Sequence, residues 1–235
     1  MNLKRTLAVV ASTTALVLAG AAGAQAKVLE LTGTTTFTRS QQATQFLANH
    51  GVSVAPTGEA TAEEGSFVFP IAAGFGSPRT FNGLLAHKGG LKFAKGERSA
   101  VVRRFVAVRH RGVAVLLAQV PGLRGGCGHL KAALRRFAAT HPGAARHARK
   151  AARNHPKAAR KLLRKVRNYC DGGRVIVLAR LTNLGKTVDY GGALLTADLK
   201  LSREAARLLN RLADERIVSA GAPLGTAASR VSVVD

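Results

Sequence analysis

Short runs of β-branched and aromatic residues, bounded by glycine and proline, recur along most of this 235-residue chain. Such runs at short intervals are typical of antiparallel β-sheets rather than of helical bundles. Two longer runs, 101–110 and 112–120, meet at Arg111 and predict a β-hairpin. The other predicted strands are 31–38, 51–56, 65–71, 90–96, 172–181, 191–201 and 228–235. We therefore expect a mainly β fold, an antiparallel β-sandwich or a barrel.

Two short helices are predicted within this β pattern. Thr38 and Gln41 have the Ser/Thr-x-x-Gln spacing of a capping box and precede a helical run over 43–51. Ser202 precedes a second helical run over 205–215. Each run follows a strand and leads into a valine-containing strand that ends in Ala-Pro. The likeness indicates a degenerate internal repeat at the two ends of one domain, and two unrelated β–helix–β elements are the alternative.

Residues 1–26 have the pattern of a cleaved export signal. A basic start at Lys4 is followed by the apolar residues 6–20 and by a small-x-small ending at Ala26. A transmembrane anchor is the alternative, but it would need about 20 apolar residues. We therefore expect a secreted or cell-envelope protein with a single domain over 27–235.

Cys127 and Cys170 predict one disulfide, because paired cysteines in exported proteins are usually oxidised. It would close a 44-residue loop and stabilise the fold by about 4 kcal/mol in the chain-entropy model. Two free thiols are the alternative. Within 127–170, helical stripes interrupted at Pro142 and Pro156 predict a basic α-helical hairpin, inserted between two strands of the β domain.

The inserted segment concentrates the charge of the chain. Of a formal net charge of +24, thirteen Lys and Arg and no Asp or Glu lie between the two cysteines. This density predicts non-specific binding of polyanions such as envelope polymers, nucleic acid or an anionic membrane surface. The scarcity of stacking aromatics argues against specific nucleic-acid recognition, and a solvated excursion without a partner is the alternative. The polyanion-binding candidates are Arg135, Arg136, Arg146, Arg149, Lys150, Arg153, Arg160, Lys161, Arg164 and Lys165.

Catalysis finds no support in the pattern of residues. Only Glu97 lies between Glu64 and Asp171, so paired carboxylates at a useful spacing are hard to assemble. Nucleophile-elbow, zinc-protease and phosphate-loop motifs do not occur. The histidines of the inserted segment lie among cations, which disfavours a divalent metal. We therefore expect neither an enzyme nor a metal site.

Four short stretches resemble HtaA-like domains of exported actinobacterial proteins. They are GSFVFP at 65–70, FNGLLAHKGGLKF at 81–93, LSREAA at 201–206 and GAPLGTA at 221–227. The resemblance implies a β-rich, surface-associated scaffold, and characterised members bind haem through a tyrosine ligand supported by a histidine. We therefore expect a secreted, non-catalytic binding module with an HtaA-like scaffold and no obligatory cofactor.

The histidine of the resembling motif is His87, and its surroundings decide what the resemblance implies about haem. The family's N-terminal tyrosine has no counterpart here, since the only tyrosines are Tyr169 and Tyr190. Haem or another porphyrin bound near His87 and Tyr190 is the first alternative function. We expect His87 to lie in a turn between two strands, and the alternative is that it binds a ligand.

Overall fold

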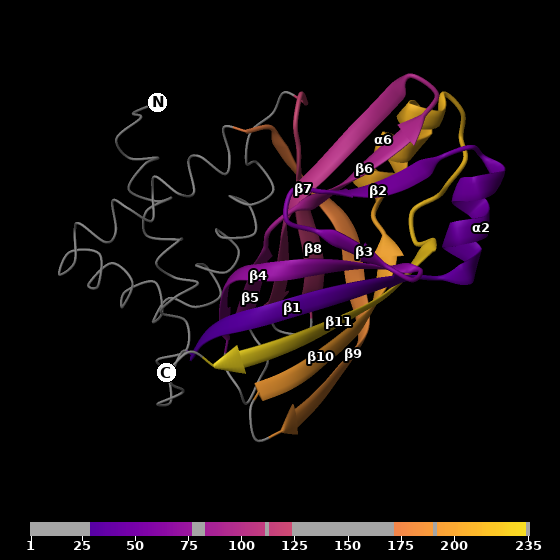
Figure 1. Ribbon diagram of the computed structural model, residues 1–235. Coiled ribbons are helices and arrows are strands. Elements are labelled where there is room, and N and C mark those ends of the chain that lie inside the picture. The colour runs from indigo at the N-terminus through magenta and orange to yellow at the C-terminus, as the bar shows by residue number, and fades with distance from the viewer. Residues whose placement is uncertain (1–28, 77–82, 111–112, 124–171, 190–191, 234–235) are drawn as a thin grey trace, which may run out of the picture.

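The structure is a computed structural model that describes residues 29–76, 83–110, 113–123, 172–189 and 192–233 (Figure 1). The described residues form mostly antiparallel strands, with two helices. The strands are β1 (Leu29–Arg39), β2 (Ser53–Thr57), β3 (Thr61–Glu63), β4 (Ser66–Gly76), β5 (Gly83–His87), β6 (Gly90–Lys95), β7 (Arg98–His110), β8 (Val113–Val120), β9 (Arg174–Asp189), β10 (Gly192–Leu201) and β11 (Pro223–Val233). The helices are α2 (Gln41–Asn49) and α6 (Arg203–Ala213).

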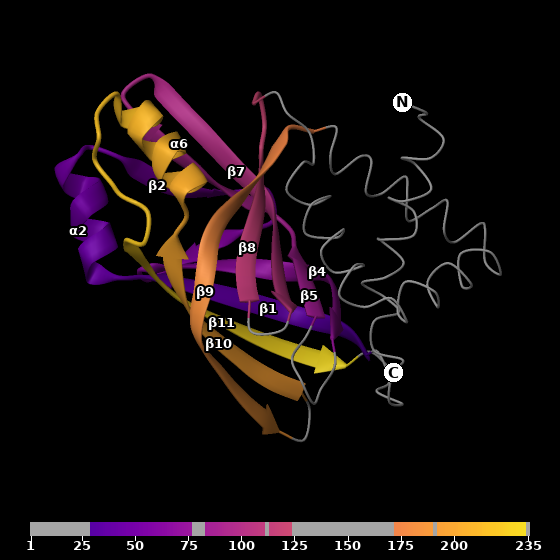
Figure 2. The same ribbon diagram turned by 180° about the vertical axis from the view of Figure 1, so that it is seen from behind.

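Eight strands close into an antiparallel barrel. Around the barrel the order is β7-β5-β4-β1-β11-β10-β9-β8, and β8 pairs with β7 to complete the circle. Figure 2, the view from behind, shows β8 and β9 in front, on the side of the barrel that faces away from the viewer in Figure 1. Of the two predicted architectures, the barrel is confirmed and the sandwich is wrong. Closure removes the free edges that an open sheet of this width would expose.

The barrel closes because β7 changes partners along its length. Its first half pairs with β6, and its second half pairs with β5 and β8. Between the halves Arg104 has φ 53, and the register to β8 shifts between Arg103 and Val106. A bulge of this kind bends a strand and increases its local twist. β2 and β6 therefore extend from the barrel as a flap, and β3 adds to β4 outside the circle.

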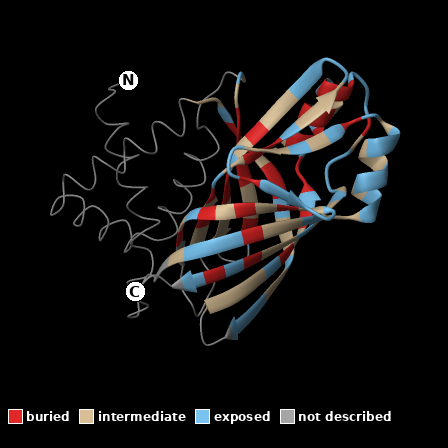
Figure 3. Cartoon of the chain, viewed as in Figure 1, coloured by how far each residue is buried: buried red, intermediate tan, exposed pale blue. Residues whose placement is uncertain are grey.

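Both predicted helices are confirmed, and α6 begins after Ser202 as expected. The predicted cap of α2 at Thr38 is wrong: α2 begins after Ser40, and the Thr38 hydroxyl lies 2.9 Å from the Ser66 hydroxyl instead. The Ser40 hydroxyl accepts a hydrogen bond from the Ala43 backbone N–H at 3.0 Å, and Ser202 does the same for Ala205. Figures 1 and 2 place both helices at the same end of the barrel. Figure 3 shows that α6 has a buried face, whereas α2 has no buried residue. α6 thus packs against the core at this end of the barrel, whereas α2 lies at the surface.

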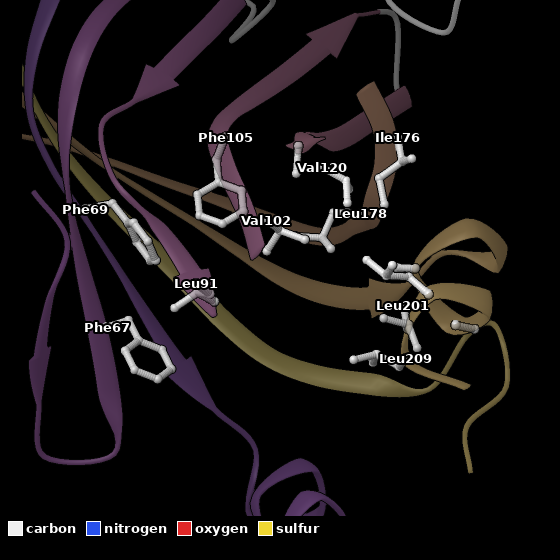
Figure 4. Packing of buried hydrophobic residues seen from close by; sticks show 14 of the residues in the cluster. Phe67, Phe69, Leu91, Val102, Phe105, Val120, Ile176, Leu178, Leu201 and Leu209 are labelled. Atoms are coloured by element: carbon white, nitrogen blue, oxygen red, sulfur yellow. The ribbon is translucent and has the colours of Figure 1, made fainter. Parts of the chain in front are cut away.

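The largest buried cluster fills the space between α6 and the interior of the barrel (Figure 4). Leu208 and Leu209 of α6 meet aliphatic residues from β8, β9 and β10 there. Phe69 and Phe105 pack edge to face with ring centroids 5.1 Å apart. Edge-to-face packing of buried rings stabilises a core beyond the area that it buries. The helix end of the barrel interior therefore has an apolar, partly aromatic wall.

The predicted strands are confirmed, with additions. β3, β5, the second half of β9, the end of β4 and the start of β11 were not predicted, and β5 carries His87. A strand–helix–strand order occurs twice, as β1-α2-β2 and β10-α6-β11. The prediction of a valine-containing strand before Ala222 and Pro223 is wrong, because residues 216–222 form no strand and β11 begins at Pro223. The repeat itself stays a prediction. The export signal, the disulfide and the basic hairpin lie outside the described residues. None of the helices in the described part of the chain is long and apolar enough to cross a membrane.

Candidate functional site

A cavity of about 840 Å³ occupies the interior of the barrel. An eight-stranded barrel is just wide enough to be filled by side chains or to hold one small ligand. Here several inward positions carry small residues, among them Ala107, Ala114 and Ala193. Side chains of this size leave space where larger ones would meet across the barrel. The volume lies within the range of small-molecule sites, about 300 to 1,000 Å³.

Aromatic residues line the half of the cavity that is nearer the helices. Phe37 and Phe67 stack at 6.4 Å between ring centroids, and Phe69 and Phe105 form the edge-to-face pair. Figure 4 shows Phe67, Phe69 and Phe105 along the same interior space. Phe46 of α2 also lines the cavity. A wall of this kind suits a flat, apolar ligand, because rings stack on rings.

Three buried polar side chains interrupt the apolar lining. The Thr35 hydroxyl lies 2.8 Å from His87 Nε2 and 2.7 Å from the Ser229 hydroxyl, and His87 Nδ1 lies 3.3 Å from the Phe105 carbonyl oxygen. A carbonyl can only accept, so Nδ1 carries the proton. Nε2 is then an acceptor, and Thr35 donates to it while accepting from Ser229. The polar row, as we call Thr35, His87 and Ser229, is neutral and internally hydrogen-bonded.

Burial keeps His87 neutral. Desolvation is the main cause that lowers its pKa to about 4, and the hydrogen bond to the Phe105 carbonyl works weakly in the opposite direction. The side chain is only 6% exposed. Neutral imidazole is the form that binds metals, and metal-binding histidines usually donate their second ring N–H to a carbonyl or carboxylate. His87 therefore has the protonation state and the outer hydrogen bond of a metal ligand.

Arginine side chains supply positive charge to the lining. Arg39 and Arg109 both line the cavity, and the Nε of each is buried without a hydrogen-bond partner in the described structure. The Arg39 guanidinium lies 5.2 Å from the centroid of the Phe67 ring. No Asp or Glu occurs among the described lining residues. Buried donors without acceptors are costly, so the cavity is complementary to an anionic group.

Of the site residues predicted from the sequence, one lies at the cavity and the others lie outside the described residues. His87 lies in the cavity, but its predicted turn position is wrong, because it is the buried last residue of β5. Tyr190, Cys127, Cys170 and all ten polyanion-binding candidates lie outside the described residues.

Sequence reasoning missed Thr35, Ser229, Arg39 and Arg109. The alternation of Thr35, Phe37 and Arg39 along β1 could have indicated an inward face with polar members. Ser229 could not have been found in this way, since its link to Thr35 depends on the pairing of β1 with β11.

Metal binding by a dedicated cluster has no support in the described part of the chain. Within it, no three His, Cys, Asp or Glu side chains lie close enough to hold an ion. Among the described residues that line the cavity, His87 is the one histidine.

Comparison with known proteins gives a fold. No protein-family model matches the chain, and no curated protein matches it. Among solved structures, the C-terminal domain of HtaA from Corynebacterium glutamicum aligns with a TM-score of 0.53 at 13% identity, covering 87% of this chain and 99% of that domain.

Two further solved structures align below a TM-score of 0.5. The N-terminal domain of HtaA from the same organism gives 0.48 at 12% identity, covering 86% of this chain and 98% of the domain. The haem-binding protein HtaB of that organism aligns with a TM-score of 0.47 at 10% identity, covering 87% of this chain and 94% of HtaB. The resemblance seen in the sequence motifs is confirmed at the level of the fold: this chain has the fold of the C-terminal domain of HtaA.

Proposed function

We propose that this chain is a non-catalytic binding module whose barrel cavity holds a flat, largely apolar ligand with an anionic group. Haem is the ligand of this class to which the sequence motifs point. The observation that carries the proposal is the cavity itself, of about 840 Å³, with aromatic walls and a neutral, buried histidine. The pattern of residues 1–26 further supports a place outside the cytoplasm, at the cell envelope or beyond.

The described residues fit a porphyrin in three respects. Phe37, Phe67 and Phe105 would flank its apolar ring system. Arg39, with its unpartnered Nε, would bind a carboxylate through a charge-assisted hydrogen bond. His87 Nε2 is an imidazole nitrogen, which is a common ligand of haem iron. Bound haem would supply an iron centre able to accept that nitrogen.

His87 can bind iron only if its Nε2 gives up one hydrogen bond. Its Nε2 accepts from the Thr35 hydroxyl, so this hydroxyl must turn away before the nitrogen can bind a metal. The Thr35 hydroxyl can turn to donate elsewhere, because rotation about its side-chain bond is permitted. Thr35 itself is a poor substitute for a tyrosine ligand, because an aliphatic hydroxyl does not ionise near neutral pH. We therefore assign the ligand role to His87 rather than to an oxygen donor.

A titration of the purified protein with hemin tests the proposal. Saturable binding with a shifted Soret band is expected, and His87→Ala should change the band and weaken binding. Metal-free protoporphyrin should still bind to the His87→Ala variant, because the aromatic walls and Arg39 remain. An absence of saturable binding by hemin and by protoporphyrin would refute the function. Binding of both that is indifferent to His87→Ala would refute only the ligand role.

Arg230→Gln is a matched control for Arg39→Gln. Arg230 lies on β11 between inward-facing neighbours but is itself exposed on the outer face of the barrel. Arg39→Gln should weaken porphyrin binding by about tenfold or more, the usual effect of losing a hydrogen bond to a charged group. Arg230→Gln should leave binding unchanged, and equal effects of the two variants would contradict a specific anion contact at Arg39.

A further inference from the structure

The two ends of the cavity differ in chemistry. Beyond the polar row, away from the helices, the inward residues of five neighbouring strands lie in register, as pairing shows. They are Leu31, Gly74, Leu85, Ala107 and Leu116. Ala193, Leu195 and Val231 continue this lining on β10 and β11. The described lining residues of this end include no aromatic ring, in contrast to the helix end.

This aliphatic compartment has a definite length. Along β5, His87 belongs to the polar row and Gly83 pairs with Arg109 of β7, four residues further. Four residues of a strand span about 13 Å. The compartment therefore extends from the polar row to Arg109, near the end of the barrel where β7 ends and β8 begins. This length matches an extended alkyl chain of about ten carbons.

Arg109 lies at the far end of the compartment. Arg109 lines the cavity and has a buried Nε with no hydrogen-bond acceptor among the described residues. Its neighbours across the sheet are Gly83 on one side and Ala114 on the other. These small residues leave space beside the guanidinium for a ligand group. A carboxylate would match the planar fork of the guanidinium with two parallel hydrogen bonds.

We infer that this end of the barrel binds an aliphatic carboxylate, with its alkyl chain in the aliphatic compartment and its carboxylate on Arg109. The inference does not depend on a porphyrin at the helix end, because it uses other residues. An alkyl chain fits this compartment because aliphatic side chains pack well against methylene groups. The carboxylate is required because Arg109 has no anionic partner in the described lining.

Calorimetric titration with straight-chain carboxylates tests the inference. Affinity should rise by about three- to fourfold with each added methylene until the compartment is full. Decanol should bind much more weakly than decanoate, because it lacks the charge. Arg109→Gln should weaken decanoate by about tenfold to a hundredfold, while Arg39→Gln and the exposed control Arg230→Gln should leave it unchanged.

A second variant keeps the test decisive if Arg109→Gln does not fold. Ala193→Leu fills the aliphatic compartment from β10 with an apolar side chain, and its thermal transition shows whether the barrel is intact. It should abolish decanoate binding while leaving hemin binding at the helix end unchanged. The inference is overturned if decanoate does not bind the wild-type protein. It is also overturned if Arg109→Gln and Ala193→Leu both bind decanoate as well as the wild-type protein does. Hemin binding is scored separately, so failure at one end is distinct from failure at the other.

Discussion

Acid should destabilise this protein through His87. The pKa of His87 is lowered to about 4 in the folded protein, chiefly by burial, from an ordinary value of 6.5. Between these two pH values the unfolded chain binds a proton that the folded protein does not. The free energy of unfolding therefore falls as the pH falls, beginning near pH 6.5 and ending near pH 4. One pKa unit is worth about 1.4 kcal/mol, so the full loss from this one residue is about 3 kcal/mol.

Chemical unfolding at a series of pH values measures this loss, with His87→Gln as the reference protein. Glutamine does not titrate, and its amide can still donate to the Phe105 carbonyl oxygen that His87 Nδ1 contacts. Every other titrating group is common to both proteins and cancels in the difference. From neutral pH to about pH 4.5, the wild type should lose about 2 kcal/mol more than the variant.

Two results would refute this reasoning. Parallel stability profiles for the wild type and His87→Gln would mean that His87 is not held neutral by burial. A His87 ring resonance that titrates near pH 6.5 in the folded protein would mean the same, by a direct measurement. Either result would also remove the basis for assigning His87 a neutral ligand role at the cavity.

Three further predictions concern single residues or pairs. Thr35→Val removes the hydroxyl that donates to His87 and should cost about 1 to 3 kcal/mol in chemical unfolding; an unchanged midpoint would contradict the buried hydrogen-bonded row. Gly225→Ala places a Cβ against the backbone of β1 at φ +144 and should cost about 3 to 5 kcal/mol. Gly51→Ala, at φ +64 with open space around the new methyl group, should cost only about 1 to 2 kcal/mol, and equal costs would argue against the close approach at Gly225. Thiol counting in the unfolded, non-reduced protein should find no reactive thiol if Cys127 and Cys170 are bonded, whereas two reactive thiols would rule the disulfide out.

The two proposed ligand sites share one barrel but depend on different physical features. The helix end has aromatic walls and the polar row, and its anion contact is Arg39. The opposite end has aliphatic walls and Arg109. Small inward residues keep both ends hollow, because an eight-stranded barrel lined throughout by large side chains would close on itself. The size of the inward residues therefore determines that a cavity exists, and their chemistry determines which ligands it can bind.

Local sequence signals were sufficient for most of the strands. The hairpin of β7 and β8 followed from two long β-rich runs around Arg111 and Gly112, and the start of α6 followed from its capping residue Ser202. The start of α2 was only approximate, because the cap was predicted at Thr38 and lies at Ser40. β5 was missed because its five residues lie between turn signals on both sides. The second half of β9 was missed because its residues have no β-rich pattern of their own, and pairing with β10 holds them extended.

The sequence by itself determined the β class, the presence of the two helices and the motif that contains His87, because these depend on neighbouring residues along the chain. Only the tertiary structure decided between a sandwich and a barrel, because closure depends on the pairing of β7 with β8 and on the bulge at Arg104. It alone brought Thr35, His87 and Ser229 together, across 52 and 194 positions of sequence. Such contacts depend on the register of distant strands, and no local pattern encodes that register.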